Sequence, residues 1–136
     1  MSRSESRLEI RTKAAPEPVG PYSQAVVYAG LVYASGQIPV DPRNGQKVEG
    51  EIEAQTEQVI ANLAAVLEAA GSALEKVIRA TVYLTDLSLF PRVNAVYAEH
   101  FRGIPAPARA TVEVSALPLG SLVEIDAIAI SETASI

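Results

Sequence analysis

The chain has 136 residues, of which 49% are hydrophobic, and its formal net charge at pH 7 is −5. This length suits one domain with a single core, and the hydrophobic fraction is too high for a disordered chain. The lack of cysteine excludes disulfides and thiol nucleophiles. The presence of a single histidine, His100, disfavours a catalytic zinc site. The negative net charge disfavours nucleic acid and anionic membranes as partners.

The N-terminal segment, residues 1–7, is polar and reads as a solvated tail. It has no apolar core of the kind found in secretory signals, and no stretch of the chain approaches the roughly 20 apolar residues that span a bilayer. We therefore expect a cytoplasmic protein. Residues 8–12 alternate weakly and predict an edge strand, and the prolines within residues 16–21 then predict a loop.

A hairpin is predicted next. Residues 25–29 and 31–35 read as two short strands that turn at or near Gly30. Residues 39–45 are rich in turn formers and read as a surface loop.

The middle of the chain predicts a long amphipathic helix followed by a strand. Within residues 52–70 the apolar side chains recur at steps of three and four, and Gly71 follows as a helix C-cap. Residues 77–84 are rich in β-branched and aromatic side chains, which favours a buried strand.

The last third predicts one more helix and two more strands. Asp86 or Ser88 can cap the helix, which ends before Gly103. Residues 108–114 and 122–130 read as strands.

Residues 131–136 read as a second solvated tail, so we expect one domain over residues 1–136. The predicted order is β-β-β-α-β-α-β-β, an α+β fold with two helices on one face of a single sheet. Neither face of the last two strands is uniformly polar, and an uncovered, half-apolar sheet face favours self-association.

Arg109 is the strongest candidate for a substrate-binding residue. It lies in a strand-like run of small and apolar residues, and no other Arg or Lys occurs after Arg102. A guanidinium stays charged when it is desolvated, and its planar donors match a carboxylate. The sequence therefore predicts that Arg109 binds an anion.

Glu124 is the strongest candidate for a proton-transfer residue. It has apolar neighbours on both sides in its strand. Such a carboxylate either pairs with a cation, for which Arg109 on an adjacent strand is the natural choice, or transfers protons to a bound water or substrate. The two roles are compatible, and Asp126 is a competing carboxylate.

Three further features point to a ligand site. Small residues gather at residues 20–24 and 34–37, where a ligand can approach backbone amides, although Gly20 and Gly36 can also serve turns alone. Asn94 falls on the packed face of its helix and either holds a backbone or contacts a ligand. His100 lies late in the same helix and reads as structural.

Five short motifs occur in order along the chain. They are Gly20-Pro-Tyr-Ser-Gln-Ala-Val26, Ser35-Gly-Gln-Ile-Pro39, Val93-Asn-Ala-Val-Tyr97, Pro107-Ala-Arg109, and Leu117-Pro-Leu-Gly120 followed by Val123-Glu-Ile125. In these motifs and their order the chain resembles the RidA (YjgF) family of imine and enamine deaminases, and the resemblance runs from about Ala14 to Ala129.

The resemblance implies a chorismate-mutase-like homotrimer with a central β-barrel and three clefts between subunits. Each cleft would hydrolyse a reactive 2-imino acid of amino-acid metabolism, such as 2-iminobutanoate or 2-iminopropanoate, to the 2-keto acid and ammonia. No cofactor or metal is implied, because the imine carbon is already electrophilic.

The resemblance also implies roles for individual residues. Arg109 would bind the substrate carboxylate, Glu124 would activate the water, and the Gly36 amide would help bind the substrate. The cleft would also be lined by Tyr22, Ser35, Asn94 and Thr111. Many members have cysteine where this chain has Thr111, so any thiol-dependent behaviour of relatives is excluded here.

Two other functions remain open at the level of sequence. A small-carboxylate sensor or chaperone-like trimer would use the same cleft without turnover and would not need Glu124 as a base. A ribonuclease activity has been attached to the family, and the acidic composition disfavours it.

Overall fold

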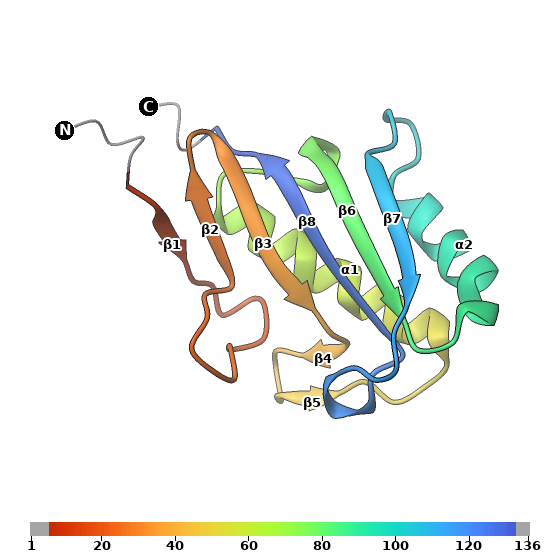
Figure 1. The fold of residues 1–136 in the computed structure, drawn as a ribbon. Helices are drawn as coiled ribbons and strands as arrows, with labels where there is room; N and C mark the ends of the chain where they lie inside the picture. The colour runs from red at the N-terminus through yellow and green to blue at the C-terminus, as the bar shows by residue number, and fades with distance from the viewer. Residues whose placement is uncertain (1–5, 133–136) are drawn as a thin grey trace.

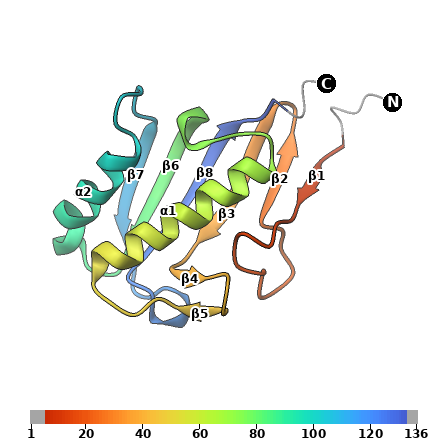
Figure 2. The same ribbon diagram turned by 180° about the vertical axis from the view of Figure 1, so that it is seen from behind.

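A mixed sheet of six strands forms one layer of the molecule, and two helices cover one of its faces (Figure 1, and from behind in Figure 2). The computed structural model describes residues 6–132. In spatial order the strands are β1 (Leu8–Ile10), β2 (Ala25–Tyr28), β3 (Leu31–Gln37), β8 (Val123–Ile130), β6 (Val77–Leu84) and β7 (Ala108–Glu113). The last strand of the chain therefore lies in the middle of the sheet.

Only the pair β6 and β7 is parallel, and the other neighbours run antiparallel. The parallel pair needs a crossover, and α2 (Phe90–His100) provides it on the helical face. Strands β2 and β3 form the predicted hairpin, which turns through Ala29 and Gly30 with φ angles of 52° and 81°. Glycine suits that position because it adopts positive φ without steric cost.

The core lies between the sheet and the long helix α1 (Ile52–Ala69). Side chains of β8 alternate strictly between the two faces. Val123, Ile125, Ala127 and Ala129 are buried against the helices, whereas Glu124, Asp126, Ile128 and Ile130 lie on the opposite face. We call this opposite side the open face.

The predicted elements are confirmed over most of the chain. The helix expected over residues 52–70 spans residues 52–69, and the strand expected over residues 77–84 has those bounds. Asp86 caps a short 3-10 turn, η3 (Leu87–Leu89), by accepting a hydrogen bond from the Ser88 amide at 3.0 Å, and α2 follows directly. Two further 3-10 turns are η2 (Leu74–Lys76) and η4 (Pro118–Gly120).

Two expectations differ from the structure. The surface loop expected over residues 39–45 contains a small second sheet of two strands, β4 (Val40–Asp41) and β5 (Gln46–Lys47). Ser131, expected in a solvated tail, is buried, and its hydroxyl donates to the Ala70 carbonyl at 2.6 Å. Residues 1–5 and 133–136 of the two expected tails lie outside the described residues.

Neither helix within residues 6–132 has the length and apolar character needed to cross a membrane.

Candidate functional site

The candidate site residues fall into two groups that lie on opposite faces of the sheet. One group surrounds a cavity of about 470 Å³ on the open face, which we call the open-face cavity. It is lined by Val19, Tyr22, Ser35, Gly36, Ile38, Pro118, Leu119 and Glu124. The other group surrounds a cavity of about 560 Å³ between α2 and β7, which we call the edge cavity. It is lined by Asn94, Tyr97, Ala98, Phe101, Ala106, Pro107 and Arg109.

Gly36 and Glu124 are in direct contact in the open-face cavity. A bulge in β3 between Ala34 and Gln37 breaks the pairing with β8 beside Glu124. A Cβ atom at position 36 would lie 2.0 Å from Oε2 of Glu124, so any residue larger than glycine would force this carboxylate to move. Gly36 therefore makes space for the Glu124 side chain in addition to any role in forming a turn.

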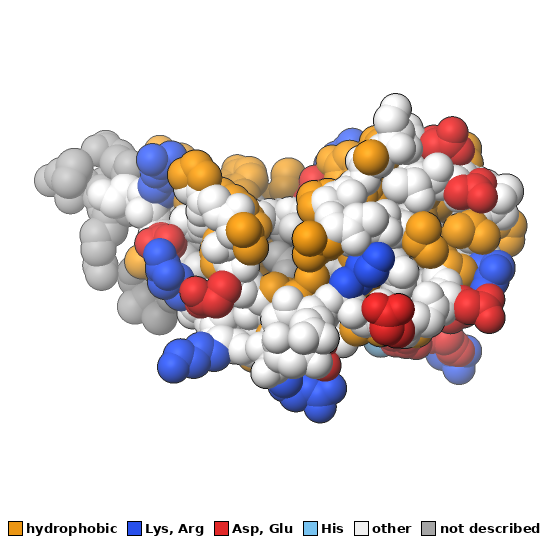
Figure 3. Space-filling view, turned by 90° about the horizontal axis from the view of Figure 1, so that it is seen from below, with side chains coloured by type: hydrophobic (Ala, Val, Ile, Leu, Met, Phe, Trp, Pro, Cys, Tyr) orange, Lys and Arg blue, Asp and Glu red, His pale blue; other side chains and the backbone are white. Residues whose placement is uncertain are grey.

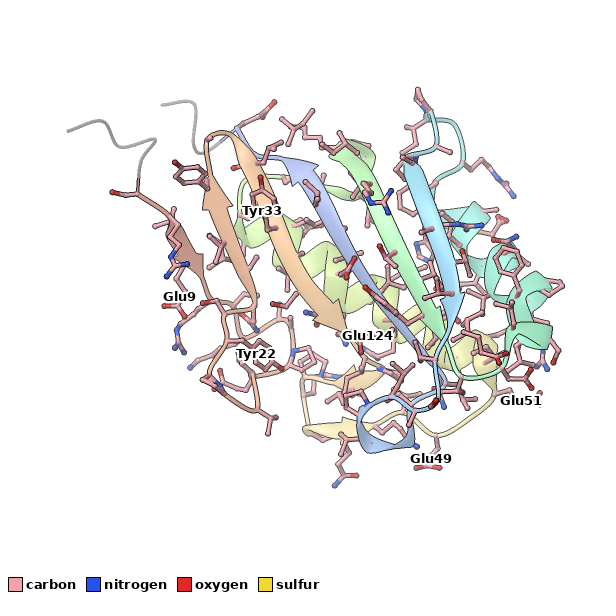
Figure 4. The ribbon with its side chains drawn as sticks, in the orientation of Figure 1. Glu9, Tyr22, Tyr33, Glu49, Glu51 and Glu124 are labelled. Carbon is pink, nitrogen blue, oxygen red and sulfur yellow. The ribbon has the colours of Figure 1, made fainter. Side chains whose placement is uncertain are left out.

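The Glu124 carboxyl is half-buried, and two effects act on it. Burial is the larger and raises its pKa, and the neighbouring negative charge of Asp126 raises it further. Figure 4 shows Glu124 in front of the sheet, at the end of the molecule near β4 and β5. A carboxyl with a raised pKa is suited to accept and return a proton.

Tyr22 and Ser35 form the wall of the open-face cavity towards β2. The Ser35 hydroxyl donates to the Ser23 carbonyl at 2.6 Å, so it holds the backbone before β2. The Tyr22 ring is 52% exposed, and its hydroxyl accepts a hydrogen bond from the Val19 amide at 3.4 Å. Tyr22 thus presents its ring to the cavity and fastens the preceding loop.

Arg109 lies on β7, and its side chain extends to the helical face. Its register partner on β6 is Ala80, which belongs to the core. The guanidinium carbon lies 4.8 Å from the ring centroid of Tyr97 and 5.3 Å from that of Phe90. Within residues 6–132 no carboxylate forms an ion pair with Arg109. The guanidinium is therefore held by aromatic rings and has no carboxylate partner among the described residues.

Asn94 and Thr111 lie near Arg109. Asn94 lines the edge cavity, and its side-chain amide makes no hydrogen bond within the described part of the chain. Thr111 shares the face of Arg109, because its register partner Val82 also belongs to the core. Strand β7 is at the end of the sheet, so one edge of its backbone is unpaired within that sheet.

The predicted ion pair between Arg109 and Glu124 is wrong. Strand β8 pairs with β3 and β6, so β6 separates the two residues. Glu124 faces the open side and Arg109 faces the helices. A small molecule bound within one copy of the chain cannot contact both side chains.

Two other candidates have structural partners. His100 Nε2 lies 2.7 Å from Oε1 of Glu57 and links α2 to α1, which confirms the structural interpretation. Asp126 accepts a hydrogen bond from the Tyr83 hydroxyl at 2.9 Å, and burial followed by this contact raises the pKa of Tyr83. Glu124 has no such partner among the described side chains and is the freer carboxylate.

Three buried amide side chains that the sequence analysis missed hold backbone segments around the open-face cavity. Gln24 bonds to the backbone of Thr12, Ala15 and Pro16, and Asn62 on α1 donates to the carbonyls of Ile38 and Val40. Gln55 on α1 accepts from the Leu122 amide at 2.9 Å. Asn62 falls among the apolar positions of the predicted helix, and that polar interruption was the available signal. Gln55 was expected among the polar positions of the helix and is nevertheless buried.

No cluster of three or more His, Cys, Asp or Glu side chains that could hold a metal ion occurs in residues 6–132.

The chain is similar to known proteins over most of its length. Residues 12–131 match the family model described as Endoribonuclease L-PSP. A RutC family protein of Pyrococcus horikoshii is 52% identical over 123 residues, which cover 90% of this chain and 97% of the relative. The 2-iminobutanoate/2-iminopropanoate deaminase of Mus musculus is 45% identical over 124 residues, which cover 91% of each chain.

A solved structure agrees with these relatives. YyfA of Yersinia pestis, a protein of unknown function in the conserved Rid family, superimposes with a TM-score of 0.90 at 50% identity. The match covers 92% of this chain and 99% of that one. The family model, the relatives and the fold thus agree over nearly the whole length, and the chain belongs to the RidA (YjgF) family.

Proposed function

We propose that this protein is a 2-iminobutanoate/2-iminopropanoate deaminase that hydrolyses 2-imino acids to 2-keto acids and ammonia. The observation that carries the proposal is Arg109, a partly buried guanidinium that borders a cavity and has no carboxylate partner among the described residues. The mouse relative that bears this activity in its name supports the same reaction.

The active site is composed of two copies of the chain. Arg109 and Asn94 of one copy provide the carboxylate-binding side, and Tyr22, Ser35, Gly36 and Glu124 of its neighbour provide the reacting side. Such a contact joins two different surfaces, and repeating it gives a ring when the rotation between copies closes; the family resemblance implies a closed ring of three copies. Each ring then holds as many sites as subunits.

The open face supplies surface for this assembly. Tyr33, Val112 and Ile130 are all 41–47% exposed although their side chains are large and apolar. Their register partners Ile128 and Tyr83 place the first two on the open face with Glu124. Burying these side chains between the sheets of neighbouring copies, as in a central barrel, would be favourable.

Glu124 moves the protons of the reaction. The carboxylate takes a proton from water as the water oxygen bonds to the carbon of the protonated imine, and the carbon–nitrogen double bond becomes single. The carboxyl then gives that proton to the amine nitrogen. Ammonia leaves as the hydroxyl oxygen forms the carbonyl, and the hydroxyl proton returns to Glu124 and passes to ammonia. Water and the iminium ion are consumed, and a keto acid and ammonium are formed.

Replacing Arg109 tests the proposal. Arg109→Ala removes a charge-assisted contact to the substrate carboxylate, so kcat/KM should fall by about 100-fold, which corresponds to about 3 kcal/mol. Arg109→Lys keeps the charge but loses the planar donors, so its activity should lie between that of the wild type and that of the alanine variant.

The assay follows the decay of imines formed in place by an amino-acid oxidase, corrected for spontaneous hydrolysis. Full activity of Arg109→Ala would rule out this mechanism. Unchanged thermal unfolding of both variants is the control for folding.

A further inference from the structure

We propose that a pocket next to Glu124 receives the substrate side chain, accepts the methyl and ethyl groups of the two substrates named above, and favours longer uncharged apolar side chains. Leu119 and Val19 are its specificity-determining residues. The inference rests on the proposed function, because Glu124 then marks where the imine carbon lies. It goes further by stating which 2-imino acids this chain prefers.

The pocket adjoins the open-face cavity, and we call it the inner pocket. Its volume is about 240 Å³, and it shares Val19, Tyr22, Gly36, Ile38 and Leu119 with the open-face cavity. Its remaining lining residues are Pro16, Glu17, Gln24, Gln37, Val40, Pro42 and Gly45. This volume lies below the roughly 300–1,000 Å³ of pockets that hold whole drug-sized ligands, so it suits one substituent of a small substrate.

Apart from the exposed Glu17, the free lining of the inner pocket is apolar. The amide of Gln24 is already bonded to Thr12, Ala15 and Pro16, and that of Gln37 donates to the Ser35 carbonyl at 3.3 Å. Pro, Val, Ile, Leu and Tyr side chains supply most of the remaining surface. An apolar substituent therefore loses contact with water without leaving a polar group of the protein unpaired.

The charges around the pocket disfavour acidic side chains. Glu17 lines the inner pocket and Glu124 lines the adjoining cavity, whereas neither is lined by a Lys or Arg of the described residues. A second carboxylate on the substrate would meet two negative groups and no cation in the lining of either cavity. Like charges at close range repel, so imines of acidic amino acids should be poor substrates.

Leu119 has features of a functional residue. Its φ angle is 59°, in the left-handed region that leucine rarely adopts, and its side chain is 65% exposed. The turn around it is fixed, because Lys47 Nζ donates to the Gly120 carbonyl at 3.3 Å and the Ser121 hydroxyl donates to the Pro118 carbonyl at 2.7 Å. An exposed leucine in a strained backbone contributes little to the core, and such strain gathers at ligand sites.

Val19 lines the same two cavities as Leu119, from a different loop. It is 92% exposed, and its backbone amide is bonded to the Tyr22 hydroxyl. Figure 3 looks at the end of the molecule that carries β4, β5 and η4, and it shows a hollow with hydrophobic side chains on both flanks. Because Gln24 and Asn62 fix the backbone behind these walls, the pocket exists before a substrate binds, which favours selectivity.

Leu119→Asn is the central test. Asparagine tolerates the left-handed conformation, so the turn persists while the apolar side chain is lost. The matched control is Leu8→Asn, which removes an exposed leucine from β1, away from both cavities. Initial rates are measured with imines generated from alanine, leucine and glutamate, and spontaneous hydrolysis is subtracted.

For the wild type we expect kcat/KM for the leucine imine to exceed that for the alanine imine by about tenfold or more, with the glutamate imine below both. Leu119→Asn should lower the leucine-to-alanine ratio by about threefold to tenfold. Leu8→Asn should leave this ratio and the kcat/KM for each imine unchanged.

Equal kcat/KM for alanine and leucine imines, or equal effects of Leu119→Asn on both, would overturn the inference. A loss of turnover with every imine would instead contradict the proposed function. In that case calorimetric binding of pyruvate and 4-methyl-2-oxopentanoate still tests the pocket. Tighter binding of the branched keto acid that is lost in Leu119→Asn supports the pocket, and equal or absent binding of the two overturns it.

Discussion

Arg109 is stabilised by aromatic rings instead of a carboxylate. A guanidinium near the faces of Tyr97 and Phe90 gains about 0.5–2 kcal/mol from each contact. Rings engage the flat faces of the group and leave its in-plane N–H donors available. Those donors are the groups that bind a carboxylate in two parallel hydrogen bonds. This arrangement explains why Arg109 needs no partner within its own chain.

Glu124 predicts how activity depends on pH. Burial and Asp126 raise the pKa of this carboxyl above its ordinary value of 4.5. A general base works only when deprotonated, so kcat should rise with pH through a midpoint above 4.5. Glu124→Gln should remove this rise and lower kcat by about 100-fold. The exposed Glu75→Gln serves as the control, and a fully active Glu124→Gln protein would favour a non-catalytic carboxylate-binding role.

The same group affects stability with a defined sign. Because its pKa is higher in the folded than in the unfolded chain, the folded state binds more protons. The contribution of Glu124 to stability is fully present below the unfolded pKa and is lost as pH rises through the folded pKa. Urea unfolding of Glu124→Gln should therefore show a weaker decline in stability with pH above 4.5 than the wild type.

For single residues, the sequence suggested which chemical role a side chain could have, but it did not show which residues lie next to each other. The chemistry of an isolated arginine in an apolar run predicted an anion-binding group at Arg109. The prediction that Arg109 pairs with Glu124 was wrong. The two residues lie on strands that follow each other in sequence, but β6 separates these strands in the sheet. Periodicity places a side chain on one of two faces, but it does not reveal strand order.

At the scale of elements, buried amides on α1 and just before β2 hold loops that lie around the open-face cavity. Gln24 is 1% exposed and makes four hydrogen bonds to backbone groups of residues 12–16. Asn62 on α1 donates to the backbone carbonyls of Ile38 and Val40, in the segment that follows β3. The helix and sheet thus stabilise loops that have little core of their own.

This arrangement predicts a stability cost at Gln24. Gln24→Met keeps the volume but leaves a backbone donor and several carbonyls without partners, so the free energy of unfolding should fall by about 3 kcal/mol. The exposed Gln46→Met should change it by less than about 0.5 kcal/mol. Both values come from urea unfolding of the purified proteins, and equal stability of the two variants would contradict the role of Gln24.

Long elements were predictable because their patterns extend over many residues. Helix α1 and strand β6 each matched their expected bounds within one residue. The strands β4 and β5 have two residues each, which is too short for an alternating pattern, so the turn formers around them dominated the prediction. The burial of Ser131 depends on the Ala70 carbonyl, 61 residues away in sequence, which no local pattern can indicate.

At the scale of the whole molecule, the two groups of candidate residues lie too far apart in the fold to share one substrate within a chain. One copy brings Tyr22, Ser35, Gly36 and Glu124 together on the open face, and it holds Asn94 and Arg109 at the edge formed by α2 and β7. The proposed site composed of two copies would unite both groups without any change in the fold. Such an assembly would also bury the exposed apolar side chains of the open face.

Subunit mixing tests this composite site most directly. Arg109→Ala and Glu124→Gln chains, each inactive alone, are unfolded together in equal amounts, refolded and assayed for imine hydrolysis. If each site takes Arg109 from one copy and Glu124 from its neighbour, about a quarter of the sites regain both residues, and about a quarter of the wild-type activity returns. If the mixture forms oligomers of wild-type size and stays inactive, the two residues do not form a site between copies and the account is contradicted.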